Sequence, residues 1–137
     1  MLVYDSFVAL GRAPTISDLA AHTSGATDAS GALERLDAAH LLVLERDRSS
    51  IRMAMPFSAH DVGYTVNAGD RSWWANCAWD ALAVPVVLGC DASIEAHWLD
   101  DGSPVDLHVV DGELSSFDGF VHFTVPARSW WDDIVET

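Results

Sequence analysis

The 137-residue sequence contains no lysine, and all seven of its basic residues are arginine. Chemistry that needs a lysine amine, such as Schiff-base catalysis or a phosphate-loop lysine, is therefore excluded for this sequence. The arginines stand against 21 acidic residues, so the formal net charge is −14. A charge of this sign opposes binding to DNA, RNA and anionic lipid. We therefore expect neither nucleic acid nor membrane among the partners, and a small molecule as the ligand.

Long hydrophobic runs and cysteines are also scarce. No apolar run approaches the roughly 18 residues that a membrane-spanning helix requires, and no basic group precedes the first apolar residues, as a secretory signal would need. The two cysteines, Cys77 and Cys90, are too few for a disulfide-linked scaffold and indicate free thiols. These features predict a cytoplasmic protein.

The remaining composition, half of it apolar, is typical of one compact domain or of a small lobe fused to a second one. The acidic charge is unevenly spread along the chain. Residues 1–55 carry a net charge of −2 and residues 56–137 carry −12. The change falls beside Pro56, so we predict a lobe boundary between residues 55 and 56.

The first lobe begins with the signals of three helices. An apolar pattern over residues 2–10 predicts a short helix that Gly11 ends. Thr15 and Asp18 have the spacing of a capping box and predict the start of a second helix. A third helix follows, for which either Thr27 or Asp28 is the predicted cap.

Two apolar stretches, residues 41–44 and 51–55, then flank a polar loop as the strands of a hairpin do. Three helices followed by a hairpin are the order of a winged helix-turn-helix, whose third helix would face DNA. That helix holds Glu34 and Asp37 beside Arg35, which makes a poor surface for DNA. Because a fold alone does not establish a function, we favour a lobe that packs against the second lobe and shapes its site.

The second lobe is predicted to hold one helix and a small sheet. The helix covers residues 72–83, with Asp70 or Ser72 as its cap and Pro85 beyond its end. Alternating polar and apolar residues predict strands over 93–98, 105–110 and 120–125. The expected core consists of the apolar run 84–88 together with Ile94, Leu107, Val109, Phe123 and Val125. The expected fold is α+β: a winged helix-turn-helix lobe packed on a small mixed or antiparallel sheet, with one site-bearing helix.

Cys77 and Asp80 are three residues apart, which places them one turn apart on one face of that helix. Near the start of a helix, unpaired amide donors and the macrodipole favour a thiolate. Neighbouring tryptophans would exclude water and raise the Asp80 pKa. A thiol beside a proton donor is a reactive pair, although the residues alone also permit a buried cysteine beside a solvated aspartate.

Residues 73–82, followed by 85–89, resemble the alkylmercury (organomercurial) lyase family. In that family an aromatic–Ala–x–Cys–Ala–x–Asp–x–Leu helix runs into a Pro–x–x–x–Gly turn. Residues 56–60 resemble the family's entry segment, and 102–105 resemble its Gly–x–Pro–Val turn. The family also begins with a winged-helix lobe, so the resemblance spans nearly the whole chain.

The resemblance implies protonolysis of carbon–mercury bonds. By position, Cys77 would bind mercury, a soft metal that suits thiolate, and Asp80 would deliver the proton. The mercury would arrive as part of the substrate, and no cofactor is expected. Trp74, Asn76 and His60 are the candidate substrate-binding residues.

The family uses a second catalytic cysteine, and this sequence reaches Thr137 about where that residue would stand. We therefore expect a thiol from solution to be needed. Cys90 does not align with the missing residue, and we interpret it as a strand-edge residue, with a dithiol beside Cys77 as the alternative. Sheet edges that a missing C-terminal segment leaves exposed would favour a homodimer.

Two other functions stay open. The first is a relative that keeps the thiol and the carboxyl but acts on, or only binds, a different small molecule. The second is a winged-helix regulator in which Cys77 senses metal or oxidant. His97, His108 and His122 fall on separate predicted strands without the spacing of a zinc site, so we interpret them as solvated or hydrogen-bonded in the core.

Overall fold

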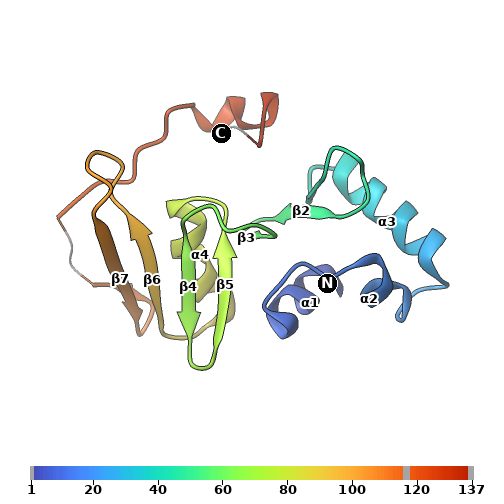
Figure 1. The fold of residues 1–137 in the computed structure, drawn as a ribbon, viewed down its shortest axis with the longest axis horizontal. Helices are drawn as coiled ribbons and strands as arrows, with labels where there is room; N and C mark the ends of the chain where they lie inside the picture. The colour runs from blue at the N-terminus through green and yellow to red at the C-terminus, as the bar shows by residue number, and fades with distance from the viewer. Residues whose placement is uncertain (1, 116–117, 136–137) are drawn as a thin grey trace.

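A computed structural model describes residues 2–115 and 118–135 of the chain, which form one antiparallel sheet with helices at one end and on one face (Figure 1). The helices are α1 (Leu2–Leu10), α2 (Ile16–Ala20), α3 (Ala26–Ala38), α4 (Ala78–Leu88) and the 3-10 helix η1 (Ala127–Asp132). The strands are β1 (Val43–Leu44), β2 (Ile51–Ala54), β3 (Phe57–Ser58), β4 (Thr65–Ala68), β5 (Arg71–Ala75), β6 (Ala92–His97), β7 (Pro104–Val110) and β8 (Glu113–Leu114). None of the helices in the described part is long and apolar enough to cross a membrane.

The first two helices follow the predicted local signals. Gly11 ends α1 with a φ of 66°, a conformation that glycine adopts without strain. Thr15 and Asp18 form the predicted capping box, in which Thr15 Oγ1 accepts the Asp18 N–H at 3.1 Å and the Asp18 carboxylate accepts the Thr15 N–H at 2.8 Å.

The predicted cap of the third helix is wrong. α3 begins at Ala26 with Gly25 as its N-cap, so Thr27 and Asp28 lie inside the first turn. Glycine is an accepted N-cap residue, and the Asp28 carboxylate instead accepts the Ser24 N–H at 3.4 Å. An acidic side chain in that turn also lies near the positive end of the helix dipole.

The predicted hairpin forms from β1 and β2, which pair Val43 with Met53. β2 then pairs with β3 and β3 with β5, so one sheet in the order β1-β2-β3-β5-β4-β6-β7-β8 passes through the predicted boundary beside Pro56. A single cluster of buried residues joins the helices α1 and α3 to the sheet and α4, and it includes Phe7, Leu33 and Ile94. The division into two lobes stays a prediction.

The helix predicted over residues 72–83 is wrong in its first part. Residues 71–75 form β5 between β3 and β4, with Trp73 and Ala75 buried and Trp74 turned to the other side. Trp73 Nε1 also donates to the Phe7 carbonyl at 3.0 Å, which ties β5 to α1. Pairing on both sides and burial of alternate residues therefore outweigh the helical pattern.

The end of that helix also differs from the prediction. α4 passes through Pro85 and ends at Gly89, whose φ of 63° closes it. Proline removes one helical N–H, but the Pro85 ring is fully buried in the core. Continuing the helix turns Val86 and Val87, which the apolar run suggested as core, out to solvent.

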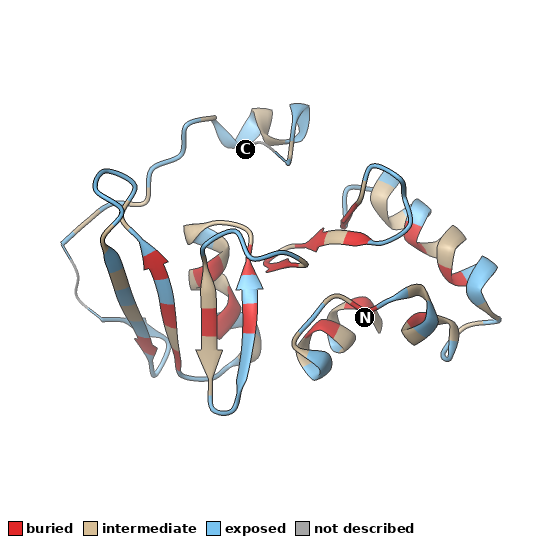
Figure 2. Cartoon of the chain, in the orientation of Figure 1, coloured by how far each residue is buried: buried red, intermediate tan, exposed pale blue. Residues whose placement is uncertain are grey.

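The strand predicted over residues 120–125 is also wrong, because these residues lie outside the sheet. β8 occupies the free side of β7 instead. The C-terminal segment, residues 118–135, runs from the sheet back toward α3 and is mostly exposed, whereas the buried residues gather where sheet, α4 and α1 meet (Figures 1 and 2). Of the predicted core, Ile94, Val109 and Val84 are buried and Phe123 is exposed.

Candidate active site

Cys77 lies at the start of α4, as its N-cap rather than inside the helix. Its backbone is extended, with φ −158° and ψ 178°, and its sulfur accepts the Asp80 N–H at 3.5 Å. A serine, threonine or aspartate oxygen usually makes this contact at an N-cap. The predicted neighbourhood of Cys77 and Asp80 is therefore present, although it arises from a helix cap.

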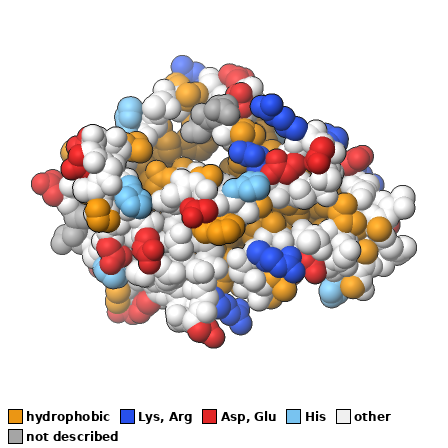
Figure 3. Space-filling model, in the orientation of Figure 1, with side chains coloured by type: hydrophobic (Ala, Val, Ile, Leu, Met, Phe, Trp, Pro, Cys, Tyr) orange, Lys and Arg blue, Asp and Glu red, His pale blue; other side chains and the backbone are white. Residues whose placement is uncertain are grey.

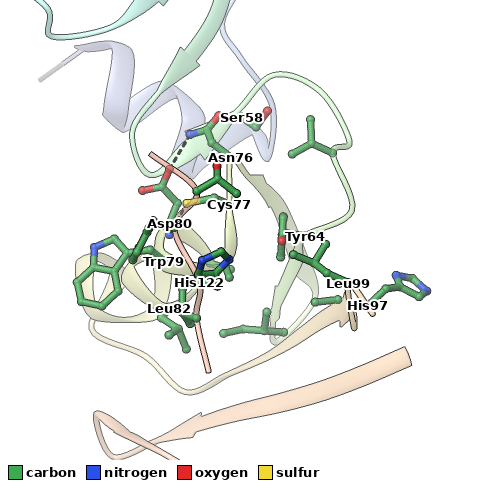
Figure 4. A pocket seen from close by; sticks show the side chains of 18 of the residues that line it. Ser58, Tyr64, Asn76, Cys77, Trp79, Asp80, Leu82, His97, Leu99 and His122 are labelled. Atoms are coloured by element: carbon green, nitrogen blue, oxygen red, sulfur yellow. Dashed lines mark hydrogen bonds between the residues drawn. The ribbon is translucent and has the colours of Figure 1, made fainter. Parts of the chain in front are cut away.

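Asn76 joins this pair from the residue before Cys77. Its Nδ2 donates to Asp80 Oδ2 at 3.1 Å (Figure 4). The same nitrogen donates to the Pro56 carbonyl at 3.3 Å. The turn between β2 and β3 therefore holds the amide that contacts the carboxyl. The three side chains of Asn76, Cys77 and Asp80 are each partly buried.

Burial controls the protonation of the pair. It raises the pKa of the Cys77 thiol, and the N–H groups of Asp80 and Trp79, which lower that pKa, do not outweigh it. The expectation that the helix start favours a thiolate is therefore wrong for the resting protein. Burial likewise raises the pKa of Asp80, against hydrogen bonds from Asn76 and from the Cys77 thiol.

The pair opens on a cavity of about 550 Å³, within the size range of small-molecule sites. Its walls come from the start of α4, the strands β2, β6 and β7, and the C-terminal segment, and they are mainly hydrophobic. Figure 3 shows a hollow bordered by hydrophobic side chains on the face in view. The arrangement places a thiol and a carboxyl together at the wall of a mainly hydrophobic cavity.

The other candidate substrate-binding residues differ in their placement. His60 lines the cavity, and its Nε2 contacts Glu45, which also accepts from Arg52 at 3.5 Å. Trp74 is 39% exposed and does not line the cavity, because alternation along β5 turns it away from Trp73.

Cys90 lies just beyond the other end of α4 and is exposed. Because α4 has 11 residues, roughly 16 Å of helix separate the two cysteines. Cys90 therefore does not join Cys77 in a dithiol in this structure. Among the described residues, no group of three or more histidine, cysteine or acidic side chains could hold a metal ion.

Sequence reasoning missed several residues that line the cavity. Tyr64 is one, and burial together with the charge of Cys77 raises its pKa. His122, expected on a strand, lines the cavity from the C-terminal segment (Figure 4). Trp79, one of the tryptophans expected beside the pair, does line the cavity. Its ring forms an aromatic row with Phe123 and Trp130, with centroids 6.3 Å and 5.4 Å apart, and Trp130 is a further lining residue that was missed. No local pattern signals that residues 120–135 fold back over α4.

Comparison with known proteins identifies a family and a similar fold. The family model for alkylmercury lyase matches residues 57–137. Ten solved chains are similar, among them the crystal structure of the mercury-bound form of MerB2, with 24% sequence identity and a TM-score of 0.62. That match covers 80% of this chain and 53% of the other, so this chain spans about half the length of the solved protein. No curated protein matches the chain.

The structural match supports the fold, a mixture of helices and antiparallel sheet. The family model covers more than half of the chain, including Asn76, Cys77 and Asp80. The chain therefore belongs to the alkylmercury lyase family.

Proposed function

We propose that this chain cleaves carbon–mercury bonds by protonolysis, with Cys77 binding mercury and Asp80 delivering the proton. The observation that carries the proposal is the contact of a partly buried thiol with a partly buried carboxyl at the wall of an apolar cavity. Membership of the alkylmercury lyase family supports the reaction class.

In the first step, the substrate R–Hg–X enters the cavity and mercury approaches the Cys77 sulfur. A coordinating thiol loses its proton to a nearby base, and the Asp80 carboxylate is in contact with it. The sulfur–mercury bond forms, X leaves as an anion, and Asp80 becomes a neutral acid. The raised pKa of Asp80 makes the carboxyl a better acceptor for this proton than an ordinary aspartate.

In the second step, Asp80 transfers the proton to the carbon bound to mercury. The electron pair of the carbon–mercury bond forms the new carbon–hydrogen bond, and R–H leaves. Asp80 is again a carboxylate, and Hg(II) remains on the Cys77 sulfur. No electron donor or acceptor is needed, because mercury stays in the same oxidation state.

A thiol from solution completes the reaction. Soft metals favour thiolate ligands, and of the chain's two cysteines only Cys77 lines the described cavity. A small thiolate would take the second position on Hg(II) and then carry the ion away by ligand exchange. The cavity volume leaves room for such a molecule beside the substrate.

The walls of the cavity would hold the organic group. Trp79 and Leu82 on α4 and Phe123 from the C-terminal segment offer apolar surface, while Asn76 and His60 offer polar contacts at its edge. Residues 1–55 would form a winged-helix-like lobe with a supporting role, because Arg52 and Met53 of β2 line the same cavity.

The test is hydrocarbon release from phenylmercury in excess small thiol. We expect release by the unaltered chain and by Cys90→Ala, and a loss of at least about 100-fold in Cys77→Ala and Asp80→Ala, as for removal of a nucleophile or a general acid. Stoichiometric mercury binding without release from the unaltered chain would refute the proposed reaction and leave a mercury-binding protein.

A further inference from the structure

We propose that Asn76 is a positioning residue that fixes Asp80 Oδ2 as a hydrogen-bond acceptor and so leaves Oδ1 to carry the transferable proton. The inference rests on the proposed function, because it concerns how Asp80 acts as the acid. It assigns Asn76 a role toward the carboxyl as well as the predicted one toward substrate.

The orientation of the Asn76 amide is set from outside the pair. The Pro56 carbonyl can only accept a hydrogen bond, so the atom of Asn76 that faces it at 3.3 Å must be the nitrogen. The second N–H of the same nitrogen then points to Asp80 Oδ2 at 3.1 Å. The Pro56 carbonyl between β2 and β3 thereby fixes the amide orientation, and with it which oxygen of Asp80 accepts the N–H.

The contact determines where a proton resides on Asp80. An oxygen that accepts an N–H is stabilised without a proton, whereas the other oxygen of the carboxyl keeps its basicity. A proton taken from Cys77 is therefore held on Oδ1. A single fixed position for the proton removes one rotational freedom from the transfer to carbon, and alignment of reacting groups is a large contribution to catalysis.

If Asn76 served stability only, it would be an unfavourable choice of residue. Its Oδ1 atom is buried and has no hydrogen-bond partner within the described residues, and an unsatisfied buried acceptor destabilises a fold. An apolar side chain would avoid that cost. The hydrogen bond from its nitrogen to Asp80 Oδ2 is a function that an apolar side chain at this position would not supply.

Other ionisable groups share the cavity with Asp80. They are Cys77 at the start of α4, Arg52 on β2, His60 after β3, Tyr64 before β4, His97 and Asp100 around the end of β6, and His122 on the C-terminal segment. Activity alone would mix their effects with that of Asp80, so Asp80 must be observed directly.

The test follows the Asp80 carboxyl carbon by NMR in protein labelled at aspartate, with Asp80→Asn to assign the signal. Asn76→Leu removes the donor and should raise the Asp80 pKa, because the carboxylate loses a stabilising hydrogen bond. Asn67→Leu is the matched control, since Asn67 Nδ2 donates to a different carboxylate, Glu95 Oε1, at 3.0 Å. It should leave the Asp80 titration unchanged.

Single-turnover hydrocarbon release should fall about ten- to 100-fold in Asn76→Leu. Asn76→Ala serves the same purpose if the leucine variant does not fold. An Asp80 titration identical in the Asn76 variant and the unaltered chain would overturn the inference, as would unchanged release. A moved titration in a chain that releases no hydrocarbon would support the contact and refute the proposed reaction.

Discussion

Cys77 and Asp80 influence each other because both are partly buried and in contact. The negative charge of Asp80 raises the pKa of the thiol, and the thiol's hydrogen bond lowers the pKa of the carboxyl. The raised pKa keeps the Cys77 thiol protonated at rest, and in the proposed mechanism mercury binding releases that proton. This behaviour opposes a sensor that depends on a free thiolate, the alternative function considered from the sequence.

Replacing Asp80 should make Cys77 more reactive toward an alkylating agent. Asp80→Asn removes the negative charge, so the Cys77 pKa should fall and the thiolate fraction should rise several-fold at a pH below that pKa. The measurement is the rate of carboxamidomethylation between pH 6 and 9 in a Cys90→Ala background, which leaves one thiol. An unchanged or slower rate would contradict the electrostatic coupling.

At the scale of helices and strands, short-range sequence signals predicted those parts of the structure that neighbouring residues alone determine. The capping box of Thr15 and Asp18 and the end of α1 at Gly11 need only neighbouring residues. Residues 71–75 could not be assigned in this way, because their strand depends on partners from β3 and β4. The pairing of Cys77 with Asp80 was predictable from spacing, whereas the Asn76 contact depends on the distant Pro56.

Two glycine substitutions should shift stability in opposite directions. Gly89→Ala places a side chain at φ 63°, and although a Cβ there meets nothing within 4 Å, the strained backbone should cost about 1 kcal/mol. Gly31→Ala lies inside α3, where the new Cβ would contact only Arg35 at 3.5 Å, and should stabilise by about 0.5–1 kcal/mol. Urea unfolding of both variants would detect the difference, and equal midpoints would contradict it.

The C-terminal segment is held over the cavity by aromatic contacts at two places. Phe123 packs between Trp79 and Trp130, and Trp131 stacks on His40 at the end of α3 with a centroid distance of 4.1 Å. This second contact ties the segment to the helices of the first 55 residues. The same segment therefore forms part of the cavity wall and joins α4 to the residues just after α3.

Loss of the stack should loosen this wall. In the Cys90→Ala background, Trp131→Ala should increase the rate of Cys77 alkylation several-fold, because local opening exposes the thiol. Arg128→Ala changes an exposed residue of the same 3-10 helix and is the control, for which we expect no change. Equal rates in the two variants would show that the stack does not control access.

For the molecule as a whole, the predicted α+β class is confirmed in its coarse form, and the winged-helix detail stays a prediction. A chain-wide property such as net charge could be evaluated from sequence, but the continuity of eight strands could not, since it depends on non-local pairing. The homodimer also stays a prediction. The edges of the described sheet, β1 and β8, have two residues each, and short edge strands offer little backbone for pairing with a second copy.

The most direct measurement is single-turnover reaction of phenylmercury with the chain in D₂O and excess thiol, with mass analysis of the gas phase. Proton delivery from an exchanged Asp80 to carbon predicts benzene that carries one deuterium, formed by the unaltered chain and absent with Cys77→Ala. Benzene without deuterium, or the same yield from Cys77→Ala, would contradict protonolysis by the Cys77 and Asp80 pair.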